Sequence, residues 1–313
     1  MMRTVYAPYV FSGGVYKHGQ IIELLEDVGG YLVNKMATVT EVTMDMMIPV
    51  SDVSLIEELA QKLLGTLVKS PLTGVEIAVV SPTLASHHLP HSACDIAEYL
   101  RHPGAKTTMI GLARGMGRRV SLNDHFERQL INEHDIALYC LGSFRDCIIN
   151  KKPRLFEGVR VPVIATGGPK EIDVEEINGA DMYIGNLGRL AHRMRSANEI
   201  SALDVMNERV GELVEEMRRD LSRDPPAVLP ARAMKEIENQ VPEVMRSLAP
   251  SPLVLKMSGV RVKLPYDLFH ERVRNVEFDE GPKLGDIATI TKSRMNDYIL
   301  VEIKPKSEVG FEI

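Results

Sequence analysis

The chain is poor in the residues that several functional classes require. It has no tryptophan, only 5% aromatic residues and a net charge of -6 at pH 7, which suits neither base stacking nor the binding of polyanions. No apolar run is long enough to span a bilayer, and the first residues contain no apolar core of a signal peptide. We therefore expect a cytoplasmic protein that has neither nucleic acid nor membrane among its partners.

Cysteine is also scarce, and the number and spacing of the cysteines limit the disulfides and metal clusters that the chain can form. The three cysteines are Cys94, Cys140 and Cys147, with no CxxC pair among them. This usage fits a reducing compartment better than a disulfide framework. It cannot supply the four-thiolate shell of an ordinary iron-sulfur cluster from one chain. Because no GxSxG motif and no convincingly placed acidic pair occur either, hydrolase chemistry has little support.

The patterns that are present indicate an α/β protein of three domains. Residues 1–74 read strand, helix, strand, strand, helix, strand, as in a ferredoxin-like (split βαβ) α+β domain. From 75 to 222 strands and helices alternate, which predicts a Rossmann-like domain with a parallel sheet. Paired prolines at 225 and 226 cannot continue the preceding helix. Residues 223–313 then read as a small domain of a helix plus short strands.

The individual elements follow from apolar runs and helical spacing. The expected strands of the middle domain are residues 77–80, 107–112, 136–141, 161–165 and 181–184, and a long helix is expected from Asn198. In the last domain the patterns predict a helix over about 231–248 and strands at 273–278, 287–291 and 298–303.

Possible metal ligands concentrate just after the first strand of the middle domain. His87, His88, His91 and Cys94 lie within eight positions there, and Cys147 follows the third strand. Ligands of open α/β sheets bind beyond the carboxyl ends of the strands. These residue types bind soft and borderline metals, and helix dipoles stabilise thiolates at helix starts. One hypothesis is therefore a metal or cluster site made from Cys94 and Cys147, with Cys140 or a histidine as a further ligand.

Other interpretations of these residues remain open. Cys94 and Cys140 could be buried small hydrophobic residues, with the histidines packing or capping helices. The glycine-rich, cationic turn at 111–119 could hold a phosphate, although it matches neither a Walker A loop nor GxGxxG. That turn could equally face a partner protein. A nucleotide- or small-molecule-binding Rossmann module is therefore a rival hypothesis.

Two segments, 87–100 and 104–115, carry a resemblance to a known family. Here the sequence resembles methanogenesis marker protein 7, and the similarity extends through nearly the whole chain. The middle domain also resembles methyl-coenzyme M reductase operon protein C. In that relative, the resemblance implies a cysteine at the position matching Cys94 and a histidine at the position matching Cys147.

The resemblance implies a non-enzymatic subunit of the ATP-dependent complex that reductively activates methyl-coenzyme M reductase. It implies a complex iron-sulfur cluster, like the precursor of the nitrogenase cofactor, shared with a partner chain. The implied ligands are Cys94 and Cys147, with His91 as a further cofactor-binding residue and Cys140 left in the strand core. The implied partners are the reductase, its operon protein C, other methanogenesis marker proteins and an ATP-hydrolysing component. A structural adaptor without a cluster of its own is the alternative.

Overall fold

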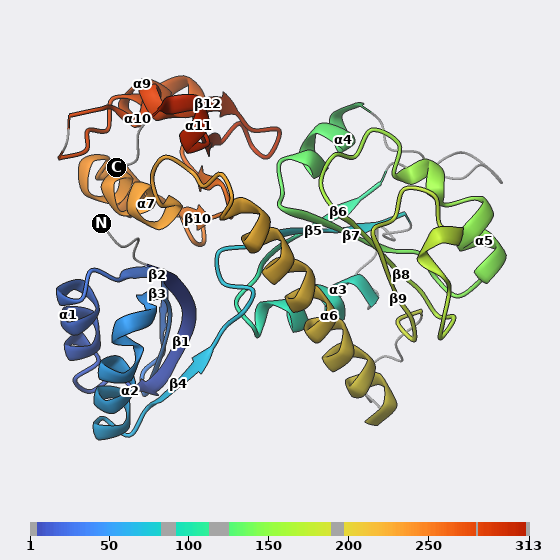
Figure 1. Ribbon diagram of the computed structural model, residues 1–313, viewed down its shortest axis with the longest axis horizontal. Helices are drawn as coiled ribbons and strands as arrows, with labels where there is room; N and C mark the ends of the chain where they lie inside the picture. The colour runs from blue at the N-terminus through green and yellow to red at the C-terminus, as the bar shows by residue number, and fades with distance from the viewer. Residues whose placement is uncertain (1–4, 83–91, 113–124, 189–196, 280, 311–313) are drawn as a thin grey trace. The chain divides into compact units, whose positions relative to one another are not determined.

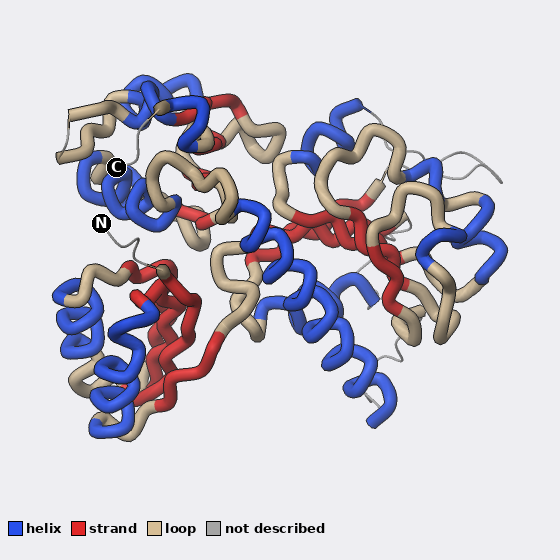
Figure 2. Tube along the Cα trace, viewed as in Figure 1, coloured by secondary structure: helices blue, strands red, loops and turns tan. Residues whose placement is uncertain are grey.

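The chain divides into two compact units (Figures 1 and 2). The computed structural model describes residues 5–82, 92–112, 125–188, 197–279 and 281–310. The first unit comprises Met1–Gly74, Met217–Lys292 and Asn296–Ile313, and the second comprises Val75–Glu216 and Ser293–Met295. One five-stranded parallel sheet and two antiparallel sheets confirm the expected α/β class. The division into three domains stays a sequence-based prediction.

The second unit is built on the parallel sheet. Its strands are β5 (Glu76–Ser81), β6 (Lys106–Gly111), β7 (Ile136–Cys140), β8 (Val163–Thr166) and β9 (Met182–Ile184). They pair in parallel in the order β6-β5-β7-β8-β9. Every residue of β5, β7 and β8 is buried, which explains the continuous apolar runs by which sequence analysis located the strands.

Helices cover both faces of this sheet (Figure 1). On one face α4 (His125–Asn132) and α5 (Arg145–Asn150) contribute Ile131 and Ile148 to a core with β7. On the other lie α3 (Ser92–Arg101) and the long helix α6 (Ala197–Leu221), joined by a hydrogen bond from Asn207 Nδ2 to the Tyr99 carbonyl at 3.3 Å. None of the helices in the described ranges has the length and apolarity needed to cross a membrane.

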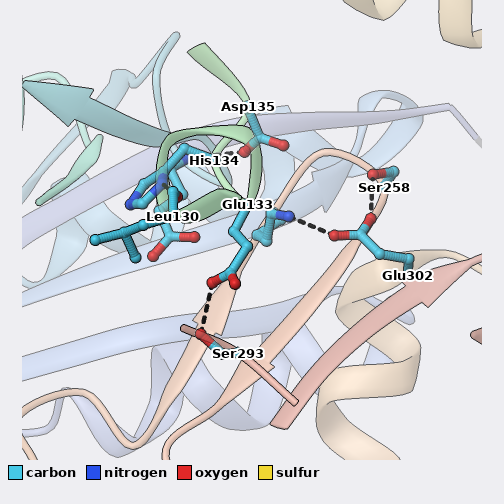
Figure 3. A network of polar contacts seen from close by, with 9 residues as sticks. Leu130, Glu133, His134, Asp135, Ser258, Ser293 and Glu302 are labelled. Carbon is cyan, nitrogen blue, oxygen red and sulfur yellow. Dashed lines mark hydrogen bonds and ion pairs between the residues drawn. The ribbon is translucent and has the colours of Figure 1, made fainter. Parts of the chain in front are cut away.

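The loop before β7 carries buried polar groups at the amino ends of the strands (Figure 3). Asp135 Oδ2 accepts a hydrogen bond from the Glu76 backbone at 2.8 Å, and His134 Nδ1 lies 2.9 Å from the Leu130 carbonyl. The Glu133 carboxylate accepts from Ser293 Oγ at 2.6 Å and from the Arg294 backbone at 2.7 Å. Paired in this way, the loop anchors the start of β7 rather than offering free groups for chemistry.

The first unit contains an N-terminal antiparallel sheet. Its elements are β1 (Tyr6–Gly14), α1 (Gly19–Asp27), β2 (Tyr31–Ala37), β3 (Glu41–Pro49), α2 (Val53–Lys62) and β4 (Thr66–Lys69), in the order of elements expected from the sequence. The strands pair as β2-β3-β1-β4. Both helices pack on one face through a core that includes Phe11, Ile21, Met44 and Ile56. The ferredoxin-like name for this arrangement remains a sequence-based interpretation.

A second antiparallel sheet in the same unit comes from the end of the chain. Its strands β10 (Leu253–Leu255), β11 (Gly259–Val262), β13 (Ile299–Ile303) and β12 (Ala288–Lys292) pair in that order. The accompanying helices are α7 (Pro230–Gln240), α8 (Glu243–Arg246), α9 (Tyr266–Arg274), α10 (Leu284–Ile287) and α11 (Lys306–Val309). Tyr31, Val33 and Met47 of β2 and β3 pack against this core, so the two ends of the chain share one apolar interior.

Two expectations for the C-terminal region are wrong. The predicted strand at 273–278 is not formed: residues 273 and 274 end α9, where Phe269 and Val273 lie four residues apart at helical spacing, and residues 275–278 contain only an isolated bridge at Glu277. The helix predicted over 231–248 ends at Gln240, because Pro242 cannot continue it, and α8 follows separately. The short strands β10 and β11 were not expected.

Candidate functional site

The strand order of the parallel sheet singles out the gap between β5 and β7. The strand that follows β5 in sequence, β6, lies on one side of β5, and β7 lies on the other. The connection from β5 to β6 therefore runs in one direction across the sheet, and the connection from β7 to β8 runs in the opposite direction. In open α/β sheets such a switch point, outside the carboxyl ends of the strands, is where ligands bind. The segments that follow Ser81 and Cys140 consequently form the most promising site.

Cys94 lies beside this switch point, in the first turn of α3. The helix begins at Ser92, and its Ala93, Ile96 and Leu100 side chains are buried, so that face packs toward the sheet. Cys94 itself is exposed. The alternative that Cys94 is a buried packing residue is therefore wrong, and its thiol is available to a ligand.

Cys147 occupies the matching place after β7. It lies in the first turn of α5, where the neighbouring Ile148 is buried and Cys147 is partly exposed. The side chain of Phe144, directly before the helix, is 79% exposed. Because α3 and α5 cover opposite faces of the sheet but both begin at its carboxyl edge, the two accessible thiols flank the switch point from the two sides.

Cys140 has a different environment, at the end of β7. It is buried, and the burial raises the pKa of its thiol to about 12. A hydrogen bond with Thr166 lowers that pKa in part, whereas the charge of Cys94 raises it. A thiol held protonated in the core is a poor metal ligand, as expected for a strand-core cysteine.

The structure does not describe all of the remaining predicted ligands. His87, His88 and His91 lie outside the described residues, as do positions 113–119 of the glycine-rich turn. Within the described ranges, no three His, Cys, Asp or Glu side chains are grouped as they would be to hold a metal ion. The site that can be described thus consists of two accessible thiols and no completed metal shell.

Glycines at this edge of the sheet allow the loops that follow the strands to pack closely against one another. The Gly168 backbone donates a hydrogen bond to the Gly142 carbonyl at 2.9 Å, which joins the loops after β7 and β8. A Cβ at Gly168 would lie 2.9 Å from Ser143 Oγ, and one at Gly188 would lie 2.6 Å from the Gly168 Cα. The loops can approach only because these positions lack side chains. The glycines that follow three successive strands were the sequence signal for this packing.

Arg145 also fixes the start of α5, and sequence reasoning gave it no role. Its guanidinium forms an ion pair with the Glu176 carboxylate at 2.5 Å. Nearby, the Tyr183 hydroxyl donates to the Pro169 carbonyl at 2.7 Å. Burial raises the pKa of Tyr183 to about 12, and the charge of Arg145 opposes that rise. No spacing pattern pairs Arg145 with Glu176, because Arg145 begins α5 and Glu176 lies 31 residues later, after β8.

Comparison with protein families identifies the chain. A family model described as methyl-coenzyme M reductase operon protein C matches residues 6–276. The chain belongs to this family. The match confirms the resemblance to operon protein C, and it extends well beyond the middle domain to which the sequence analysis assigned that resemblance. Family membership links the chain to methanogenesis, while the marker protein 7 resemblance stays a prediction.

A relative of this chain occurs in Methanocaldococcus jannaschii. The two proteins are 48% identical over 313 residues, which is 100% of this chain and 98% of the relative, a protein described as uncharacterized. The match covers both units.

Comparison with solved structures supports no particular fold or function for this chain. The phospho-2-dehydro-3-deoxyheptonate aldolase of Thermotoga maritima is 10% identical with a TM-score of 0.18, covering 64% of this chain and 77% of the aldolase. Glutamyl-tRNA reductase from Methanopyrus kandleri is 10% identical with a TM-score of 0.21, covering 78% of this chain and 88% of the reductase. Scores this low support neither a shared fold nor a shared function.

The accessible thiols of this chain could supply part of the ligand shell of an iron-sulfur cluster. Thiolates are the usual ligands of such clusters, commonly four of them. Cys94 and Cys147 are accessible at one edge of the sheet, and Cys140 is buried. Two accessible thiols are too few to form the whole shell of such a cluster from the described residues, so a cluster at this edge would need further ligands.

Proposed function

We propose that this protein is a subunit of the ATP-dependent complex that reductively activates methyl-coenzyme M reductase. In this proposal it holds part of a complex iron-sulfur cluster and docks partner subunits, without an enzymatic activity of its own. Membership of the operon protein C family supports the link to the reductase. The proposed partners are the reductase, its operon protein C as a second, separate chain of the same family, other methanogenesis marker proteins and an ATP-hydrolysing component, all in the cytoplasm.

One observation carries the cluster role. Cys94 and Cys147 lie in the first turns of the helices that follow β5 and β7, on either side of the switch point. Two accessible thiols at the place where α/β sheets bind ligands favour a functional role over a packing role. The helix N-termini, with their positive partial charge, would stabilise the negative charge of a thiolate-ligated cluster.

The incomplete shell suggests how the site is completed. Each of two α/β chains meeting at their carboxyl edges could contribute a cysteine and a further ligand to one cluster. Cys94 and Cys147 would be the ligands from this chain, and His91 is retained as a possible further contact. When bound, the cluster would supply low-potential electrons. The chain's own role is to hold it, to orient it toward the partner and to exclude water.

The test measures iron in anaerobically reconstituted activation complexes. Cys94→Ala and Cys147→Ala should each lower iron and sulfide per complex and reduce the electron paramagnetic resonance signal of the cluster, together with reductive activation. Cys140→Ala is the matched control, because the buried thiol should contribute no ligand. Full iron content and activity in both ligand variants would show that the proposed cluster role is wrong.

A structural adaptor is the second candidate. It is favoured by the lack of three grouped ligands within the described ranges. If this candidate is right, the cysteine variants should retain their iron, and substitutions on the exposed surface should prevent assembly instead. Complexes purified by size-exclusion chromatography would separate the two, since cluster loss leaves subunit content unchanged whereas adaptor loss does not.

A further inference from the structure

One end of the N-terminal sheet gathers three connections that lie far apart in sequence. Gly14 of β1 pairs with Glu41 of β3, and Ser12 pairs with Thr66 at the start of β4. The loop after β1, the turn between β2 and β3 and the turn between α2 and β4 therefore meet at the same end. A hydrogen bond of 3.2 Å from the Val15 backbone to the Thr40 carbonyl joins the first two directly.

Each of these three connections exposes a large apolar side chain. Tyr16 is 77% exposed, Val39 93% and Leu64 94%. Single exposed apolar residues are common on protein surfaces, whereas apolar residues gathered at one place mark interaction sites. The other end of the same sheet differs, because Tyr31 packs there against the core of the C-terminal sheet.

The backbone of Leu64 strengthens this distinction. The Gly65 and Leu64 backbones donate to the Ala60 and Gln61 carbonyls at 2.8 and 3.0 Å, which is the Schellman pattern at the end of α2. Leu64 takes the left-handed position of that motif, with φ of 56°. Glycine or asparagine normally occupies this position, because a branched side chain is strained there. A strained and exposed leucine contributes little to the stability of the chain, so it needs another explanation.

The charges around these residues have one predominant sign. Lys17, Lys35 and Lys62 are exposed, and none forms an ion pair with another described residue. The Nζ of Lys17 lies 5.2 Å from the Tyr16 ring centroid, so this cation sits directly beside an apolar group. Glu41, the first residue of β3, is an acidic residue at this end of the sheet. A surface of this kind attracts carboxylates as well as apolar side chains.

We propose that this end of the sheet docks a segment of a partner protein whose apolar side chains are flanked by carboxylates. The tip surface consists of Tyr16, Lys17, Lys35, Val39, Lys62 and Leu64. Val39 and Leu64 bury apolar side chains of the segment, and the three lysines pair with its acidic residues. This surface belongs to the first unit and does not depend on the cluster proposed at Cys94 and Cys147.

The first experiment uses a synthetic peptide with the full-length protein. A fluorescein-labelled amphipathic peptide carries leucine and phenylalanine on one face and glutamate on the other, and its twin carries lysine in place of glutamate. Fluorescence anisotropy should show saturable binding of the acidic peptide and binding of the basic twin that is weaker by about tenfold or more. Absence of binding at about 1 mM peptide, or equal binding of the twins, would overturn the proposal.

Variants then locate the binding to the tip surface. Leu64→Asn should weaken acidic-peptide binding about tenfold, since it removes a buried apolar contact, while Tm stays unchanged or rises because asparagine tolerates a left-handed backbone. The combined K17E, K35E and K62E chain should lose the preference for the acidic peptide. Leu248→Asn changes a leucine that is equally exposed elsewhere in the first unit, and it should bind like the unmodified chain.

Other occupants give distinct results. A dimer in sedimentation velocity that Leu64→Asn converts to a monomer would assign the surface to a second copy of this chain and overturn the proposal. Cosedimentation with phosphatidylserine vesicles that Leu64→Asn abolishes, without peptide binding, would do the same in favour of a lipid surface. Cys94→Ala should bind the peptide normally, so failure of the cluster proposal and failure of this one are separable.

Discussion

The parallel sheet of the second unit and the N-terminal sheet of the first unit handle burial differently. Every residue of the central strands β5, β7 and β8 is buried, whereas β1, a central strand of the N-terminal sheet, keeps most of its residues partly or fully exposed. A sheet covered on both faces leaves its chemistry to the strand ends, where Cys94 and Cys147 lie. A sheet with helices packed on one face keeps exposed side chains along its faces and at its tip, where they can make other contacts. The proposed site and the proposed docking surface follow this difference.

The largest effect should come from a cavity in the parallel sheet. Leu138 lies in β7, the central strand of the five, and is completely buried. Leu138→Ala should lower the free energy of unfolding by about 2–5 kcal/mol, because it removes buried apolar contacts and leaves a cavity. Urea unfolding of the second unit's helices and strands, followed by circular dichroism, measures the loss. A loss under about 1 kcal/mol would mean that this sheet is not packed on both faces.

A smaller effect should appear at alkaline pH, through Cys140. Its pKa rises from 9.0 to about 12 on burial, so the folded chain keeps a proton that the unfolded chain releases. The resulting stabilisation is fully present below pH 9 and is lost as the pH rises toward 12. Between pH 8 and 10 the free energy of unfolding should fall by about 1 kcal/mol from this group.

The control for that pH dependence is Cys140→Ala, which has no thiol to titrate. Its unfolding free energy should be lower at pH 8, because a small cavity remains, and it should vary less between pH 8 and 10 than that of the unmodified chain. Identical slopes in the two proteins would show that Cys140 is accessible to water in the native state. Alkylation by iodoacetamide supplies a second readout, in which the exposed Cys94 should react long before the buried Cys140.

The same contrast explains how far the sequence could be interpreted. The strands of the parallel sheet were predictable because burial on both faces requires continuous apolar runs, as at 136–140. The positions of Cys94 and Cys147 after strands 77–80 and 136–141 placed both at one edge of the sheet. Their accessibility was not predictable, since the sequence equally allowed Cys94 to be a buried packing residue.

Features that depend on long-range contacts could not be predicted from the sequence. The order β6-β5-β7 creates the switch point, and only pairing between distant strands determines it. The joining of the two chain ends in one unit depends on Tyr31 packing against a core from residues beyond 226. Local chemistry misled in the C-terminal region, where the apolar residues of 273–278 resembled a strand although Val273 belongs to the buried side of α9.

The smallest effect should come from the exposed face of the N-terminal sheet. Val68 lies in β4, is 57% exposed and pairs with Val10 of β1. Val68→Ala should change the free energy of unfolding by less than about 0.5 kcal/mol, because exposed positions lose little contact on truncation. Val68→Thr keeps the branched shape that suits a strand and should be closer still to the unmodified chain. A loss from Val68→Ala that approaches the loss from Leu138→Ala would show that this face is covered in the folded protein, and that the two sheets are buried alike.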